Sequence, residues 1–284
     1  MQTAVAGVPE RISESRVPVW RILGRNPGPM TGPGTNSYLI GESRLSLIDP
    51  GPRDGDQLRS FLEAIGDRKL EYILATHTHG DHSPGAAELQ RVTGAEMVGL
   101  PAPEHGYNDP TFSPGREWRH GDLLDCGEYT IRMLHTPGHV SNHFCFLLCE
   151  EQLLFTGDHV LQGTTSVILP PDGNMSDYLD SLEELQQLPL RYLAPGHGNL
   201  IHDPHTEIGK LVEHRMRRES KIERSLAGIG TCTLEELVVV VYDDVDKSMH
   251  RWAERTMLAH LEKLEREGRA RRRTGEKAER WSPM

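Results

Sequence analysis

The stretch Thr76-His77-Thr78-His79-Gly80-Asp81-His82 contains four potential metal ligands within six positions. It follows the apolar run Tyr72-Ile73-Leu74-Ala75, which is typical of a buried strand. On an extended backbone His77 and His79 point to the same side, so one metal ion can bind both. On a helix the two side chains would diverge by about 200 degrees, because the helical period is about 3.6 residues. The pattern therefore favours a metal-binding loop at the end of a strand.

The second half of this stretch can serve a second ion. Gly80 allows the chain to turn, and Asp81 and His82 then lie close to the first pair of histidines. Imidazole suits zinc, and a carboxylate adds a harder ligand, so the group suits a first-row metal. The competing interpretation is a polar loop between a strand and a helix in which the histidines occur by chance. The remainder of the chain separates the two interpretations.

Length and composition indicate a folded protein with room for one large domain or two ordinary ones. The chain has 284 residues, of which 36% are hydrophobic and 26% are charged. No segment approaches the roughly 18 consecutive apolar residues that a membrane span needs. Residues 1–19 include Glu10 and Glu14 and lack an apolar core of signal-peptide length. We therefore expect a cytoplasmic protein that does not enter a membrane.

Charge is distributed unevenly along the chain. The net charge is −11, with −13 on residues 1–205 and +2 on residues 206–284. Such an asymmetry indicates two units, and we place the boundary between 205 and 206.

Short apolar runs alternate with Gly- and Pro-rich turns over the first unit. The predicted strands are residues 37–40, 45–48, 72–75, 96–100, 129–134, 144–148, 153–155 and 191–194. The predicted helices are residues 57–65, 84–92 and 176–188. Strands followed by helices, with reactive residues at the strand ends, predict a layered α/β domain. Residues 101–121 have no clear period and predict a long irregular loop, which is either a lid or binding wall or a plain surface loop.

The second unit has a different character. Helices are predicted at 207–226, 234–242 and 249–267, the second opened by a capping box from Thr233 to Glu236. Residues 269–273 and 277–281 then predict a hairpin around the turn 274–276. Three helices and a β-wing describe a winged-helix-like domain over residues 206–284.

Three later segments add further ligand-type residues at the ends of predicted strands. They are His139, Asp158 and His197, and each stands beside a glycine that permits a sharp turn. With the opening stretch they make seven ligands, which suits two ions. Three histidines would serve one ion, an Asp-His-His set the other, and one carboxylate would bridge them.

This pattern resembles the metallo-β-lactamase superfamily, whose signature is a His-x-His-x-Asp-His cluster followed by separate His, Asp and His motifs. The resemblance implies a four-layer αββα sandwich and two Zn²⁺ ions, although other divalent transition metals suit the same ligands. It assigns the ligands as follows: His77, His79 and His139 to the first zinc, Asp81, His82 and His197 to the second, and Asp158 to both. Asp49, in Leu47-Ile48-Asp49-Pro50-Gly51, matches the acidic motif that supports the metal loop. Residues 34–40, 163–165 and the C-terminal module resemble the β-lactamase-like protein 2 subfamily.

The implied chemistry is hydrolysis. Two zinc ions lower the pKa of a bridging water from 15.7 towards about 7, which makes a hydroxide nucleophile at neutral pH. Asp81 is placed to orient that hydroxide and to accept a proton. One zinc also polarises the oxygen on which charge develops.

The substrate is less explicit. We expect a small ester or thioester, of the acyl-CoA or acyl-glutathione type, because a charge of −13 over residues 1–205 is unfavourable for collecting a polyanion. The alternative is a single-strand-specific endoribonuclease of the β-lactamase-like protein 2 type, with Arg269, Arg271, Arg272 and Arg273 holding phosphates of RNA. In the competing interpretation these arginines form a solvated wing beside Glu262, Glu265, Glu267, Glu276 and Glu279. A second alternative is a non-catalytic metal-binding regulator of DNA. The C-terminal helices could also pair in a homodimer.

Overall fold

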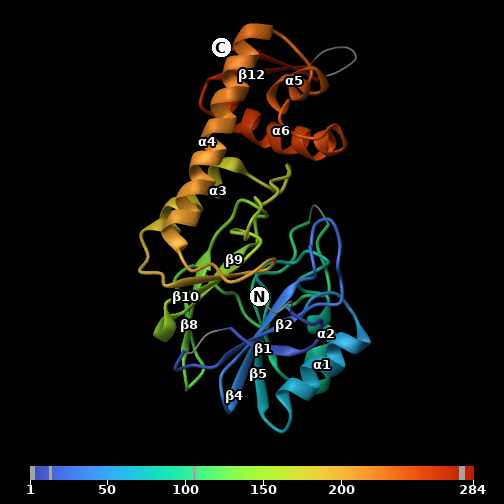
Figure 1. Ribbon diagram of the computed structural model, residues 1–284, viewed down its shortest axis with the longest axis vertical. Helices are drawn as coiled ribbons and strands as arrows, with labels where there is room; N and C mark the ends of the chain where they lie inside the picture. The colour runs from blue at the N-terminus through green and yellow to red at the C-terminus, as the bar shows by residue number, and fades with distance from the viewer. Residues whose placement is uncertain (1–3, 13–14, 105–106, 275–278) are drawn as a thin grey trace.

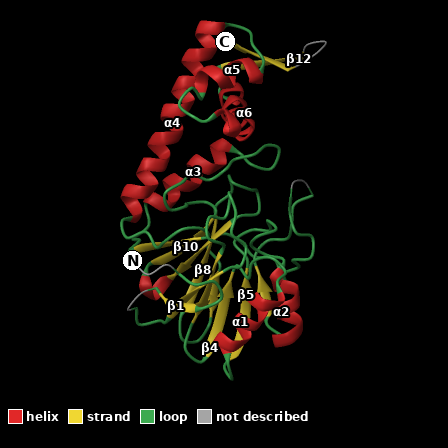
Figure 2. Ribbon diagram, turned by 45° about the vertical axis from the view of Figure 1, so that its right-hand side comes forward, coloured by secondary structure: helices red, strands yellow, loops and turns green. Residues whose placement is uncertain are grey.

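Two β-sheets stack face to face because their strands bury side chains on both surfaces. The computed structural model describes residues 4–12, 15–104, 107–274 and 279–284. Every residue is buried in the central strands β3 (Asn36–Ile40) and β9 (Phe144–Leu148). Strands buried on both faces need a cover on each side, and helices supply the outer covers here (Figures 1 and 2).

The first sheet has six strands in chain order. They are β1 (Pro9–Arg11), β2 (Val19–Leu23), β3, β4 (Arg44–Ile48), β5 (Lys69–Leu74) and β6 (Glu96–Val98). Pairing is antiparallel from β1 to β4 and parallel from β4 to β6. Because β4 and β5 are parallel, the residues that follow both strands meet at one edge of the sheet.

The second sheet has the order β11-β10-β9-β8-β7. Its other strands are β7 (Leu123–Asp125), β8 (Thr130–His135), β10 (Leu153–Gly157) and β11 (Tyr192–Pro195), and the turn η1 (Cys149–Glu151) joins β9 to β10. Strands β10 and β11 pair in parallel, whereas the pairs from β10 to β7 are antiparallel.

Three apolar layers hold the first unit together. Side chains such as Tyr38, Leu74 and Phe155 fill the space between the sheets. Helices α1 (Gly55–Ile65) and α2 (Gly85–Thr93) cover the outer face of the first sheet. Helix α3 (Met175–Gln186) and the start of α4 (Pro204–Ile229) cover the outer face of the second. The expected αββα sandwich is therefore confirmed.

A separate apolar core forms the C-terminal unit, which lies at the top of Figure 1. It consists of α5 (Leu234–Val241), η2 (Lys247–Met249), α6 (His250–Arg266), β12 (Ala270–Thr274) and β13 (Glu279–Pro283). The capping box at Thr233 and Glu236 is present. Residues 275–278, which include most of the predicted turn, lie outside the described residues. Helix α4 belongs to both cores, because Ile208 and Leu211 pack on the sandwich while Ile222 and Leu226 pack on α5 and α6.

The sequence pattern missed three strands and misplaced some ends. Strand β1 is fully exposed and β7 buries only its central residue, so neither shows a clear apolar run. Strand β2 is mostly apolar and buried, but its five residues are not among the predicted strands. Helix α1 begins two residues earlier than predicted, because the Asp54 side chain accepts hydrogen bonds from the backbone N–H groups of Asp56 and Gln57. Strand β6 ends at Val98 because the next residue, Gly99, has a φ of 151°. Among the described residues, no helix is long and apolar enough to cross a membrane.

Candidate metal centre

The predicted ligands come from the ends of four strands and meet where the two sheets face each other. His77 follows β5, His139 follows β8, Asp158 follows β10 and His197 follows β11. The structure thus brings all seven predicted residues into one cluster, in the three overlapping groups His77/His79/His139, His77/His82/Asp158 and Asp81/His82/His197.

The first group presents three ring nitrogens to a common point. The distance from His79 Nδ1 is 3.0 Å both to His77 Nε2 and to His139 Nε2. Two nitrogens bound to one tetrahedral zinc at its usual bond length stand about 3.3 Å apart. The spacing therefore suits three ligands of one ion.

The second group is arranged around carboxylates. Asp81 Oδ2 lies 3.2 Å from His197 Nε2 and 3.6 Å from His82 Nε2. Asp158 Oδ1 lies 3.3 Å from the Nε2 atoms of both His82 and His197. Its other oxygen, Oδ2, is 3.8 Å from Nε2 of His139, which belongs to the first group. One carboxylate thus faces both groups.

Unpaired buried atoms indicate that these residues fit metal ions. Nε2 of His82 and Oδ1 of Asp158 are buried and lie 3.3 Å from each other, and neither forms a hydrogen bond of normal geometry with a described group. Burying a polar atom without a partner costs free energy, and a bound cation between the two atoms would remove that cost. Imidazole nitrogens with two carboxylates form a donor set typical of zinc.

Asp49 supports this loop from behind. Its carboxylate accepts hydrogen bonds from the backbone N–H and the hydroxyl of Thr76, at 2.7 and 2.8 Å. The same carboxylate lies 2.9 Å from Nδ1 of His82, so it holds that ring with Nε2 facing the cluster. Asp49 is itself in the left-handed region, with a φ of 50°, and the hydroxyl of Ser37 donates to its carbonyl.

Other ligand rings are oriented in the same way. Nδ1 of His139 donates to the carbonyl of Val167 at 2.5 Å, and Nδ1 of His197 donates to the carbonyl of Gly34 at 3.3 Å. In each ring the other nitrogen then faces the cluster. No sequence signal points to these two partners, because any residue type can supply a backbone carbonyl.

The electrostatics of the two groups differ. Burial and neighbouring imidazoles lower the pKa of His77 and bring that of His79 to about 3, so both rings are neutral and able to bind metal. Burial also opposes a charge on His82, but Asp81, Asp158 and Asp49 outweigh it and hold the pKa of His82 well above its usual range. These three carboxylates thus favour positive charge at this point.

A glycine that the sequence pattern did not single out is needed for close approach. A Cβ on Gly196 would stand 2.8 Å from Cε1 of His82 and 2.9 Å from Oδ1 of Asp158. Its position directly before a ligand histidine, after a strand, is the signal that could have identified it.

Two further histidines lie behind the ligands. His143 is fully buried, its ring stacks on that of His77, and its Nδ1 lies 2.9 Å from the hydroxyl of Thr136. His159 is also fully buried, and its ring packs against that of Tyr178. Their burial places both side chains in the support of the site rather than on its open surface.

Comparisons with known proteins establish the family. Residues 30–197 match the family model of the metallo-beta-lactamase superfamily, and residues 233–281 match that of the beta-lactamase associated winged helix domain. This chain belongs to the metallo-beta-lactamase superfamily and carries a C-terminal winged-helix domain.

Curated relatives match along most of the chain. An atrochrysone carboxyl ACP thioesterase of Aspergillus novofumigatus is 34% identical over 261 residues, which cover 86% of this chain and 76% of the relative. A lactamase-like protein of Emericella nidulans is 32% identical over 247 residues, covering 81% and 77%. A solved structure, a metallo-beta-lactamase family protein from Thermus thermophilus, superposes with a TM-score of 0.76 over 94% of this chain and 98% of its own at 24% identity, which supports the fold.

These findings confirm the predicted family, fold and hydrolase class. The β-lactamase-like protein 2 subfamily, zinc as the metal and the substrate stay predictions.

Proposed function

We propose that this protein is a di-zinc thioesterase. The observation that carries the proposal is the Asp158 carboxylate, which faces His82 and His197 with one oxygen and His139 with the other. A carboxylate so placed suits two ions held side by side. The hydrolysis of a thioester rather than another bond is supported by the thioesterase name of the Aspergillus relative.

Each ligand has a proposed role. One zinc would be held by His77, His79 and His139, and the other by Asp81, His82 and His197. Asp158 would contact both ions. Other divalent transition metals could bind the same ligands. When bound, the ions supply a water of lowered pKa and polarise the scissile carbonyl.

Asp81 is the residue proposed to handle the proton. Its side chain is 29% exposed, twice the exposed fraction of Asp158 at 14%, so it borders the open side of the cluster. Burial raises its pKa, but His82 and His197 outweigh burial and keep the pKa below the usual value. Asp81 is therefore ionised at neutral pH and can orient a water and accept its proton.

The substrate would be an acyl group carried on a thiol such as coenzyme A, glutathione or the prosthetic group of a carrier protein. We also propose the division of the chain into a catalytic unit, residues 1–205, and a winged-helix unit, residues 206–284, with the first turns of α4 packed on the catalytic unit. We further propose that the protein acts in the cytoplasm. Pairing through the C-terminal helices and regulation of DNA are not part of this proposal.

The structure weakens the case for the endoribonuclease. Arg269 forms ion pairs with Glu219, Glu223 and Glu267. Arg272 pairs with Glu262, Glu265 and Glu279. The endoribonuclease hypothesis assigns four arginines to the phosphates of RNA, and the charges of two of them are neutralised by glutamates of the same chain. This agrees with the alternative interpretation of a solvated wing. Arg271 and Arg273 are exposed and remain the arginines with which to test RNA binding.

A parallel turnover assay tests the proposal. Three proteins are compared: the wild type, Asp81→Asn, and the double variant Arg271→Glu/Arg273→Glu. Each is incubated with acyl-CoA, acyl-glutathione, an acyl carrier protein thioester and a single-stranded RNA. We expect thioester turnover that Asp81→Asn lowers about a hundredfold or more and that the arginine changes leave intact. If the wild type cleaves RNA and the two arginine changes abolish that cleavage, the proposed thioesterase function is wrong and the endoribonuclease function is supported.

Metal content is measured in parallel by elemental analysis. The wild type should hold two zinc ions per chain, and Asp158→Ala should lose both because it removes the carboxylate that the two groups share. Two retained ions with full activity in Asp158→Ala would contradict the ligand assignment.

A further inference from the structure

The second metal group is assembled from both sheets, so its geometry depends on how the sheets are held together at this edge. Asp81 and His82 follow β5 of the first sheet, whereas Asp158 and His197 follow β10 and β11 of the second. His197 lies on the turn of residues 195–198 at the end of β11, here called the His197 turn. The 3.2 Å between Nε2 of His197 and Oδ2 of Asp81 therefore depends on where this turn lies against the first sheet.

Asn36, the first residue of β3, joins the His197 turn to the first sheet. Its backbone N–H donates to the carbonyl of Gly196 at 2.7 Å. Its side-chain Nδ2 donates to the carbonyls of Pro195 and Gly198 at 3.0 and 2.8 Å. One residue of the first sheet thus holds three backbone carbonyls of the turn. Because Nδ2 faces two carbonyl oxygens, the amide fits in one orientation only.

Two further side chains on the same face of the first sheet contact the turn. Tyr38 stands two residues after Asn36 and points to the same side. Its hydroxyl donates to the Pro195 carbonyl at 2.7 Å, and its ring centre lies 5.0 Å from that of Phe155 in the second sheet. Arg21, opposite Tyr38 on β2, donates from Nη1 to the carbonyl of Gly198 at 3.3 Å.

Burial makes these contacts important. Asn36 is 1% exposed and Tyr38 is 3% exposed. A buried amide or carbonyl without a partner costs free energy, so the turn and the amide hold each other in place. Apolar side chains fill most of the space between the sheets, but the hydrophobic effect has no preferred direction. The hydrogen bonds therefore determine the position of the His197 turn.

We propose that Asn36, assisted by Tyr38, is a positioning residue of the second metal group. Its hydrogen bonds to the His197 turn all end on backbone carbonyls, so it acts on the metal through His197 and not as a ligand. This inference rests on the two-ion centre of the proposed function. It adds the contact between the sheets that sets the geometry of one of the two ions.

A double-mutant cycle on zinc affinity tests this inference. The proteins are the wild type, Asn36→Leu, His197→Ala and the double variant, and competition with a chromophoric chelator measures their affinity for Zn²⁺. Leucine keeps the branched shape of asparagine and lacks its donors. We expect Asn36→Leu alone to weaken the binding of one of the two ions about tenfold or more. In the His197→Ala background it should change the affinity by less than about twofold, because the side chain that it positions is gone.

Two results would overturn the inference. An equal loss of affinity in both backgrounds would show that Asn36 acts on the fold in general. Unchanged affinity in Asn36→Leu would show that it does not act on the metal group. Thioester turnover does not enter this measurement. A wild type that hydrolyses no thioester would therefore contradict the proposed function, and the zinc affinities would still decide this inference.

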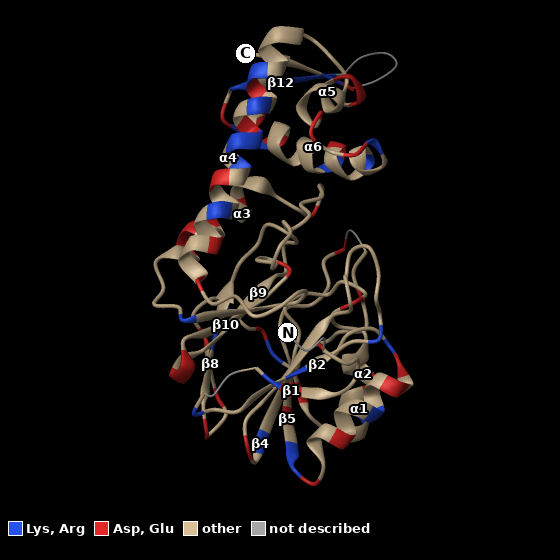
Figure 3. Cartoon of the chain, viewed as in Figure 1, with Lys and Arg blue, Asp and Glu red and all other residues tan. Residues whose placement is uncertain are grey.

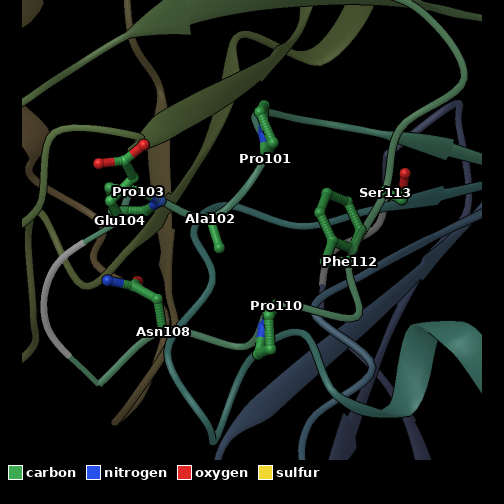
Figure 4. Close-up of a pocket in the computed structure, with 8 residues that line it drawn as sticks. All are labelled: Pro101, Ala102, Pro103, Glu104, Asn108, Pro110, Phe112 and Ser113. Atoms are coloured by element: carbon green, nitrogen blue, oxygen red, sulfur yellow. The ribbon is translucent and has the colours of Figure 1, made fainter.

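Asn142→Leu is the matched control. Asn142 is also a buried asparagine whose Nδ2 donates twice, to the Thr78 hydroxyl at 2.8 Å and to the carbonyl of Pro101, which Figure 4 labels, at 3.0 Å. Thr78 lies in the loop of the first metal group, so any loss caused by Asn142→Leu should be the same with and without His197. If that loss also disappears in the His197→Ala background, the dependence on His197 is not specific to Asn36 and the inference is overturned.

Tyr38→Phe is a milder variant that decides the inference if Asn36→Leu does not fold. It removes only the hydroxyl that donates to the Pro195 carbonyl. The expected result is zinc binding that is about threefold weaker, the effect of one hydrogen bond, and no change in the His197→Ala background. With Asn36→Leu unfolded, unchanged zinc affinity in Tyr38→Phe, or an equal loss in both backgrounds, would contradict the inference.

Discussion

At the scale of single residues, the candidate metal centre depends on residues that are not themselves proposed ligands. Asp49 accepts from Thr76 and holds Nδ1 of His82, so one buried carboxylate fixes both the loop and a ligand ring. Gly196 contributes by the absence of a side chain, since any Cβ there would meet His82 and Asp158. Such residues fix the orientation of the ligand side chains.

Gly196→Ala should therefore disturb the second metal group. The added methyl cannot be placed without moving His82 or Asp158, so we expect about tenfold or more weaker zinc binding. Competition with a chromophoric chelator measures that affinity. Gly209→Ala is the control, because Gly209 lies within α4 and an added Cβ would meet nothing within 4 Å. Equal zinc affinity in the two variants would show that the close contact at Gly196 is unimportant.

At the scale of elements, the start of α3 is joined to the turn that carries His139. The backbone N–H of Asn174 donates to the carbonyl of Gly138, and a Cβ on Gly138 would stand 2.4 Å from Cα of Tyr178. The Asn174 side chain caps α3 by accepting from the N–H groups of Ser176 and Asp177. It also accepts from Arg266 of α6 at 2.8 Å. The cap thus links helix, metal turn and winged-helix domain.

Asn174→Ala should lower the free energy of unfolding of the sandwich by about 1 kcal/mol, the usual effect of losing an N-cap. Urea denaturation followed by circular dichroism measures the change. Asn174→Asp should keep the stability of the wild type, because aspartate caps equally well and can pair with Arg266. An alanine variant as stable as the wild type would mean that α3 does not depend on this cap.

At the scale of the whole molecule, α4 joins two cores and carries charges of both signs along its length (Figure 3). Its buried Glu219 pairs with Lys263 at 3.0 Å and with Arg269 at 3.0 Å, and lies 3.4 Å from Nδ1 of His260. These contacts attach α4 to α6 and β12 inside the C-terminal unit. Arg215, one turn earlier, donates to the carbonyl of Ser166 and so attaches α4 to the loop that also holds His139.

The buried cluster predicts that the winged-helix domain loses stability in acid. Burial lowers the pKa of His260 from 6.5 to about 4, although Glu219 opposes the shift. In the unfolded chain His260 takes up a proton below pH 6.5, whereas in the folded protein it stays neutral until the pH approaches 4. The free energy of unfolding therefore has its full value above pH 6.5 and decreases as the pH falls towards 4. Burial raises the pKa of Glu219, but His260 and Lys263 bring it to about 2, so a second loss follows between 4.5 and 2.

Hydrogen exchange of the α6 amides measures the free energy of local opening at about pH 7.5 and about pH 5. We expect a lower value at the acidic pH in the wild type. His260→Gln, which cannot take up a proton, should lose most of that difference. Equal opening energies at the two pH values in the wild type would contradict the prediction.

How much could be predicted follows from how local each signal is. The metal ligands can be recognised from the sequence because their spacing and the glycines beside them lie within short segments. The capping box at Thr233 can be recognised for the same reason. Strand β1 has no local signal, because it is an exposed edge held by pairing with β2. The sequence does not predict that the carbonyls of Val167 and Gly34 orient His139 and His197, because every residue type has a backbone carbonyl.

The sequence alone determined the family, the layered α/β fold with its winged helix, and the residues that could hold metal, because residue type and spacing along the chain carry that information. Only the tertiary structure decided that Asp158 faces both ligand groups and that Arg269 and Arg272 are engaged by glutamates. These properties depend on distances between segments far apart in the chain, and packing of the two sheets and α4 sets those distances.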